Sequence, residues 1–97
     1  MPFAPFHQAA QAAAPLLLQE ECRTVAAHTV AYRLLAKVSH HTTVFLIQVL
    51  TADDTATEEL AIPLSIALAY FQRIVVGAVL PCTLGDVLED LRYLENF

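Results

Sequence analysis

Glycine is scarce in this sequence, with only Gly77 and Gly85 among 97 residues. A G-x-G-x-x-G fingerprint needs three glycines, and Gly77 and Gly85 are too far apart for a P-loop, so the common Gly-rich cradles for nucleotide phosphates are excluded. The only serines are Ser39 and Ser65, and neither sits in a G-x-S-x-G nucleophile elbow. Two cysteines are also too few for a disulfide-rich scaffold. The sequence therefore lacks the signatures of several common classes of enzyme and secreted protein.

Positive charge is also scarce. Five Lys and Arg residues stand against ten Asp and Glu residues, which gives a net charge of −5. The basic residues are spread along the whole chain: Arg23, Arg33, Lys37, Arg73 and Arg92. A protein that holds a phosphate backbone generally needs clustered positive charge. The sequence therefore predicts no nucleic-acid partner.

No metal site and no cofactor site is predicted. The sequence has no C-x-x-C and no H-x-x-x-H pair, and the adjacent His40 and His41 would point in different directions on a strand or in a tight turn. Cys22 and Cys82 are interpreted as small buried thiols, which is the usual state of a free cysteine. A Cys–His nucleophile pair meets only in the fold, so spacing does not exclude it. A small enzyme with a Cys/His site in an oligomer cleft stays as an alternative, with no catalytic residue assigned.

The longest apolar run extends over residues 60–82, which is enough for a bilayer span. Gln72 and Arg73 lie at its centre, and an Arg at mid-bilayer costs about 2.5–3.5 kcal/mol on insertion scales. We therefore interpret residues 64–80 as a buried core helix, and a membrane-associated helical protein is a second alternative. The N-terminus has no positively charged leader region, which predicts a cytoplasmic protein with reduced cysteines.

The first part of the chain is the hardest to interpret. Residues 1–14 are predicted to form an N-terminal arm, helical or frayed, ahead of a single α+β domain over residues 15–97. Pro15 suits the first turn of a helix, so a helix is expected from there to about residue 26. The apolar residues in 24–38 fit the period of a helix and the period of a strand equally well, so periodicity alone does not distinguish the two structures.

The next segment favours strands. Residues 42–51 (TTVFLIQVLT) are rich in β-branched and aromatic side chains, which is typical of a strand. A buried strand needs a partner for its N–H and C=O groups, and this favours a strand over residues 30–38 across a turn at residues 39–41. A third strand is predicted over residues 57–62 at the edge of the sheet, where the following Pro63 is tolerated.

Two helices complete the predicted fold. The first covers residues 64–80, and the second follows Thr83 as its N-cap. The apolar stripe of the second helix consists of Leu84, Val87, Leu88, Leu91 and Leu94. The predicted fold class is α+β, with an N-terminal helix, a short antiparallel β-meander and two C-terminal helices. An all-α helical bundle, in which residues 16–38 form one long helix, is the alternative.

The positive signal in the sequence is an excess of apolar residues. They make up 57% of the chain and charged residues 15%, against about 45–50% and about 25% in ordinary soluble domains. A chain of this size buries only about 60–68% of its unfolded surface, so we expect contiguous apolar surface that a partner covers. This predicts a non-enzymatic protein–protein interaction module (an adaptor, small chaperone or inhibitor) that works as a homodimer or within a hetero-complex. The candidate interface residues are Phe3, Phe6, Leu16, Leu17, Leu18, Tyr70, Phe71, Tyr93 and Phe97.

Overall fold

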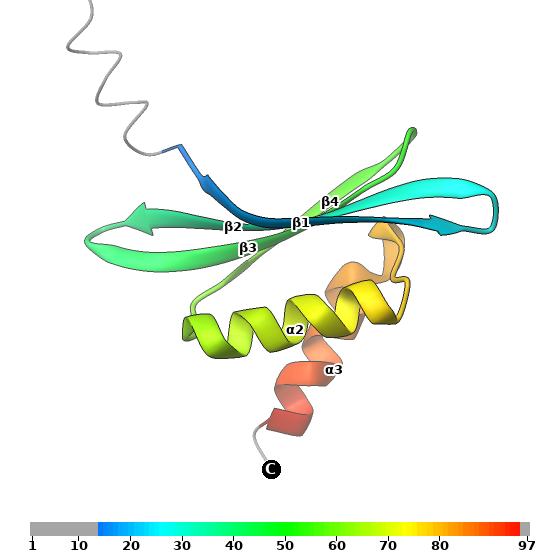
Figure 1. The fold of residues 1–97 in the computed structure, drawn as a ribbon. Helices are drawn as coiled ribbons and strands as arrows, with labels where there is room; N and C mark the ends of the chain where they lie inside the picture. Colours follow the sequence, from blue (N-terminus) through cyan, green and yellow to red (C-terminus); the bar gives the residue numbers. More distant parts are fainter. Residues whose placement is uncertain (1–13, 96–97) are drawn as a thin grey trace, which may run out of the picture.

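The computed structural model describes residues 14–95 of the chain (Figure 1). Four strands come first, namely β1 (Leu16–Val25), β2 (His28–Ser39), β3 (Thr42–Leu50) and β4 (Thr55–Leu60). They are followed by helix α2 (Leu64–Val76), the short 3-10 helix η1 (Pro81–Thr83) and helix α3 (Leu84–Glu95). The described chain is therefore a four-stranded meander followed by two helices, where the sequence predicted three strands.

The predicted N-terminal helix is wrong, and so is the all-α alternative, because the segment after Pro15 is the edge strand β1. This strand pairs antiparallel with β2, which is also paired with β3 on its other side. The pairing satisfies backbone N–H and C=O groups along β2 that an N-terminal helix would have left without partners. The predicted arm lies outside the described residues except for Ala14.

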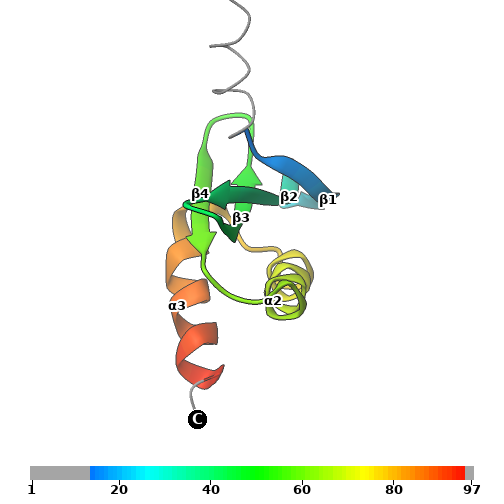
Figure 2. The ribbon, with the colours of Figure 1, turned by 90° about the vertical axis from the view of Figure 1, so that its left-hand side faces the viewer.

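The order of strands in the sheet is β1-β2-β3-β4, so each strand lies beside its neighbour in sequence. Side chains alternate across a strand, which sends Tyr32 and Leu34 to one side of the sheet and Arg33 and Leu35 to the other. Both helices lie on the same side, with α2 beneath β1 and β2 and α3 beneath β4 (Figures 1 and 2). In the part of the chain that is described, no helix or strand covers the opposite side of the sheet.

The core lies between the sheet and the two helices. It is built from alternate positions of the strands and from one stripe of each helix, and its members include Val30, Tyr32, Leu34, Phe45, Ile47, Val49, Leu60, Ala67, Tyr70, Phe71, Ile74, Leu84 and Leu88. The buried positions of α2 recur at intervals of three and four residues, as expected for a helix that packs one face on a sheet. Among the described helices, none combines the length and the apolar character that crossing a membrane requires.

Helix α2 ends at Val76, four residues before the predicted end. The N–H of Val79 donates to the Ile74 carbonyl at 3.2 Å, and the N–H of Ala78 donates to the Val75 carbonyl at 3.1 Å. This pair of bonds is the Schellman motif, which places one residue in the left-handed conformation. That residue is Ala78, with a φ of 51°, although glycine is usual at this position because it has no Cβ.

Replacing Ala78 by glycine should therefore raise the free energy of unfolding by about 0.5–1 kcal/mol, because the left-handed conformation is strained for alanine. The measurement is urea denaturation followed by far-UV circular dichroism. The matched control is Ala69→Gly at an exposed position inside α2, which should lower the same free energy by about 1 kcal/mol. If both substitutions destabilise equally, Ala78 does not occupy the strained position.

Both hairpin turns of the first three strands also hold non-glycine residues at positive φ. Ala26 and Ala27 have φ values of 50° and 69°, and His40 and His41 have 53° and 66°. Two-residue turns with positive φ at both positions match the twist of the flanking strands. Strand pairing holds these residues in a conformation that they rarely adopt on their own. Because alanines occupy both positions of the turn between β1 and β2, the sequence has no Asn-Gly or Asp-Gly signature there.

Candidate interaction surface and pocket

The uncovered side of the sheet carries ion pairs across its middle. Arg33 Nε lies 2.6 Å from Glu20 Oε2, and Lys37 Nζ lies 2.8 Å from Glu59 Oε2. These side chains are between a third and a half exposed, so each pair contributes only about 0–1 kcal/mol to stability. The pairs give Arg33 and Lys37 partners within the sheet, and neither side chain needs an anionic ligand.

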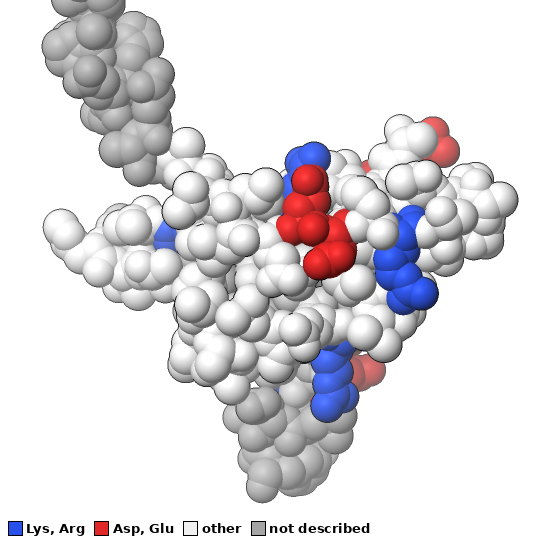
Figure 3. All heavy atoms as spheres, viewed as in Figure 1, with Lys and Arg blue, Asp and Glu red and all other residues white. Residues whose placement is uncertain are grey.

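An apolar surface lies where β1 begins. We define the leucine end as the exposed apolar side chains at this end of the molecule, which are Leu16 (66% exposed), Leu17 (48%), Leu18 (42%), Val38 (61%) and Leu64 (46%). Leu64 belongs to it because α2 starts beneath the same end of the sheet at which β1 starts (Figures 1 and 2). In Figure 3, the left-hand part of the molecule, which contains this end, shows almost no charged atoms, and most charge lies over the middle and the right.

A bulge in β1 explains how three consecutive leucines remain exposed. Leu16 lies opposite Ala36 and Leu17 opposite Leu35, so these two leucines point to opposite sides of the sheet. The register then shifts between Leu17 and Gln19, which leaves Leu18 without an opposite residue in β2. The apolar surface therefore wraps around the edge of the sheet.

The other predicted interface residues fall elsewhere. Tyr70 and Phe71 are 5% and 0% exposed and belong to the core beneath the sheet, so the structure removes them from the candidate surface. Tyr93 is 65% exposed on α3. The remaining three candidates, Phe3, Phe6 and Phe97, lie outside the described residues. The three leucines of β1 are thus the members of the predicted set that form one surface.

The far end of β1 is fixed to α2 by Arg23. Its Nη1 donates to the carbonyl oxygens of Val75 at 2.7 Å and of Val76 at 3.0 Å. Carbonyls in the last turn of a helix have no donor within the helix and carry partial negative charge, so a guanidinium is a suitable partner. Arg23 therefore has a structural role at the end of the sheet opposite to the leucine end.

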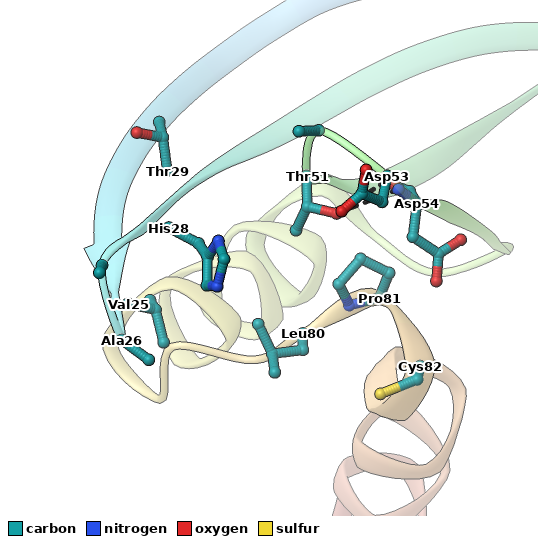
Figure 4. Close-up of a pocket in the computed structure, with 12 residues that line it drawn as sticks. Val25, Ala26, His28, Thr29, Thr51, Asp53, Asp54, Leu80, Pro81 and Cys82 are labelled. Atoms are coloured by element: carbon teal, nitrogen blue, oxygen red, sulfur yellow. Dashed lines mark hydrogen bonds between the residues drawn. The ribbon is translucent and has the colours of Figure 1, made fainter.

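A pocket of about 650 Å³ opens beside this second end of the sheet. Three segments line it, namely the β1–β2 turn, the β3–β4 turn and the residues that lead into η1. Apolar walls come from side chains such as Val25, Ala26 and Leu80, and the ring of His28 projects into the space between the three segments (Figure 4). The pocket is therefore built from parts of the chain that are distant in sequence.

Four titratable side chains line the pocket, and these are His28, Asp53, Asp54 and Cys82. Neither a Lys nor an Arg is among the lining residues. Across residues 14–95, no group of three or more His, Cys, Asp and Glu side chains is arranged to hold a metal ion. The formal charge of the lining is therefore negative, and it comes from the two carboxylates.

His28 and Cys82 both line the pocket, but no hydrogen bond joins them among residues 14–95, and Leu80 lies between their side chains (Figure 4), so they do not form the contact that a Cys/His nucleophile pair requires. Both Cys22 and Cys82 are exposed, so the expectation of two buried thiols is wrong. The chemistry of the lining suits binding better than nucleophilic catalysis.

No protein-family model, no curated protein and no solved structure matches this chain.

Proposed function

We propose that this chain is a non-enzymatic protein–protein interaction module that works as a homodimer or within a hetero-complex, and that the leucine end is its interface. The observation that carries the proposal is the run of three exposed leucines on the edge strand β1, whose outer edge pairs with no other strand among residues 14–95. Large apolar side chains that lie together on a surface are typical of protein interaction sites.

The two edges of the sheet differ in a way that supports this proposal. Strand β4 has six residues, carries Glu58 and Glu59, and is followed closely by Pro63. Short length, charge and proline are the features that protect an edge strand from pairing with another chain. Strand β1 has ten residues, and its charged residues lie beyond the leucines. Apart from Pro15, which directly precedes β1, the described part of the edge at the start of β1 therefore lacks the protection that the opposite edge has.

Burial of these leucines supplies a favourable free energy of association. Fully burying a leucine side chain is worth about 1.5–3 kcal/mol relative to leaving it exposed. Leu16 and Leu17 already have part of their surface covered, so each would contribute roughly half of that amount. Two such side chains are worth about 1.5–3 kcal/mol, which corresponds to a factor of roughly 10 to 150 in affinity.

The double substitution Leu16→Ser and Leu17→Ser should weaken association by about that factor of 10 to 150 and leave the fold intact, because both side chains are exposed. Sedimentation velocity over a range of micromolar concentrations measures self-association, and co-purification from the native host with quantitative mass spectrometry measures association with other proteins.

The matched control is Val76→Ser, which removes an apolar side chain that is 77% exposed at the other end of α2. It should leave both measurements unchanged. The proposal is contradicted when the unsubstituted chain is monomeric at every concentration and the double variant co-purifies with the same proteins at the same abundance.

A further inference from the structure

We propose that the pocket at the second end of the sheet binds a small organic cation, that is, an ammonium or amidinium group carried on an apolar body. This inference is independent of the leucine end, because none of the residues that form that surface lines the pocket. It assigns a ligand class to the pocket from its size, its walls and the sign of its charge.

The size and the walls of the pocket suit a small molecule with an apolar body. Its volume of about 650 Å³ lies within the range of about 300–1,000 Å³ that is usual for ligand pockets. Val25, Leu80 and Pro81 give it apolar surface from two segments that are far apart in sequence. Small-molecule sites are typically apolar with a few polar groups that fix the orientation of the ligand.

The charge of the lining selects a cation. Asp53 and Asp54 line the pocket from the β3–β4 turn, and neither a Lys nor an Arg lines it from any of the three segments. Asp54 Oδ1 accepts a hydrogen bond from the N–H of Thr55 at 2.8 Å. Asp53 takes part in no ion pair or side-chain hydrogen bond among residues 14–95. A carboxylate beside an apolar cavity without a counter-charge attracts a positively charged ligand and repels an anion.

The β3–β4 turn fixes the backbone from which these two exposed carboxylates project. The N–H of Thr51 donates to the Asp54 carbonyl at 2.8 Å, and the N–H of Asp54 donates to Thr51 Oγ1 at 3.1 Å. The turn is therefore closed by hydrogen bonds in both directions between its two ends. A preformed site loses less conformational entropy on binding than a mobile one.

An organic cation suits the pocket better than a metal ion. A metal site needs several ligating side chains around one point, and the described residues contain no such group. The ring of His28 stands in the pocket as a flat surface beside the apolar walls (Figure 4). One end of the ligand would lie against this ring and Leu80, and its charged end would face the β3–β4 turn.

The first test compares three probes that share one apolar body, which are 2-phenylethylammonium, 2-phenylethanol and phenylacetate. Titrations followed by proton–nitrogen correlation spectra should show the cation binding about tenfold more tightly than the alcohol, and the anion more weakly than either. Shifts should be concentrated in the three lining segments. Equal affinities for the three probes, or shifts spread away from these segments, would overturn the proposal.

The second test removes the charge. The double variant Asp53→Asn and Asp54→Asn keeps an acceptor oxygen for the Thr55 N–H and should reduce the preference for the cation over the alcohol from about tenfold to about onefold. Asp90→Asn, at an exposed position on α3, is the matched control and should leave that preference unchanged. A double variant that still prefers the cation about tenfold contradicts the assignment of the two carboxylates.

The third test uses the two cysteines and needs no variant. Cys82 lines the pocket, whereas Cys22 is exposed on β1 and does not. At a concentration of 2-phenylethylammonium that saturates the spectral shifts, alkylation of Cys82 should slow several-fold, and alkylation of Cys22 should keep its rate. Equal changes at the two thiols, or no change at Cys82, would show that the probe does not occupy the pocket.

Discussion

Replacing Phe71 by alanine should lower the free energy of unfolding by about 3–5 kcal/mol. Phe71 is 0% exposed and lies in α2 on the face that packs against the sheet. Truncation removes the whole ring and leaves a cavity that the surrounding strands fill only in part. Because a domain of this size has only about 5–15 kcal/mol of stability in total, this one change should bring the chain close to unfolding at room temperature.

Thermal and urea denaturation of the purified variant, read by circular dichroism, measures this effect. Gln72→Ala is the matched control, because Gln72 is the next residue of α2 and is exposed. It should change the free energy of unfolding by no more than about 0.5 kcal/mol. A small effect for Phe71→Ala would mean that its ring faces a partner or the solvent, as the sequence first indicated, and does not belong to the core.

Replacing Tyr32 by phenylalanine should raise the free energy of unfolding by about 1–3 kcal/mol, which is the opposite sign to the previous substitution. Tyr32 is 0% exposed at the centre of β2. Its hydroxyl is buried and has no hydrogen-bond partner among residues 14–95. Removal of a buried polar group without a partner eliminates its desolvation cost, and the aromatic ring keeps its packing.

The same substitution should change the pH dependence of stability. Burial raises the pKa of the Tyr32 hydroxyl above its ordinary value of 10.0, and the nearby positive charge of Arg23 opposes this rise more weakly. As the pH rises past about 10, the unfolded chain therefore loses this proton before the folded chain does. The stabilising contribution is complete below that pH and is lost as the pH rises through the folded-state pKa.

Urea denaturation of the wild type and of Tyr32→Phe at several pH values between 7 and about 11 tests both the gain in stability and the change in its pH dependence. The variant should be the more stable protein at pH 7, and its stability should fall less steeply above about pH 10. A variant that is less stable than the wild type at pH 7 would show that the hydroxyl has a partner. Tyr93→Phe, on the exposed part of α3, controls for the general effect of losing a tyrosine hydroxyl.

The sequence predicted the parts of the fold in which local preference and tertiary packing agree. Residues 42–51 contain so many β-branched and aromatic side chains that β3 was predicted almost to its observed bounds. The apolar stripe after Thr83 predicted α3 in the same way, and Leu84 and Leu88 are buried as that stripe requires. Strand β3 is buried at consecutive positions from Val44 to Ile47, so its signal is its composition and not an alternation. Helix α3 buries one face, so its periodicity survives in the sequence.

The prediction failed for β1 because this strand buries almost nothing. Its residues are mostly exposed on both sides, so the alternation that marks a half-buried strand is absent. The alanine pair that turns the chain between β1 and β2 also gives no local signal. Backbone pairing with β2 decides the conformation of this segment, and pairing of that kind is a tertiary effect.

The site residues that the sequence predicted and those that it did not can be explained in the same way. The leucines of β1 were predicted as surface residues because too many apolar side chains compete for a small core, and these three remain outside it. Phe71 was placed wrongly because a helical stripe shows which side chains face the same way and does not show what covers them. The pocket was missed because Asp53 lies in the β3–β4 turn and His28 at the start of β2, and only the sheet brings these two segments together.

The meander order of the sheet has a kinetic consequence. Every strand lies beside the strand that precedes it in the chain, and turns of two residues join β1 to β2 and β2 to β3. Closing such short loops costs little entropy, and a single hairpin forms in about 1–10 μs. Assembly of this chain can therefore start from any hairpin and grow outward strand by strand, without a slow search for a distant segment.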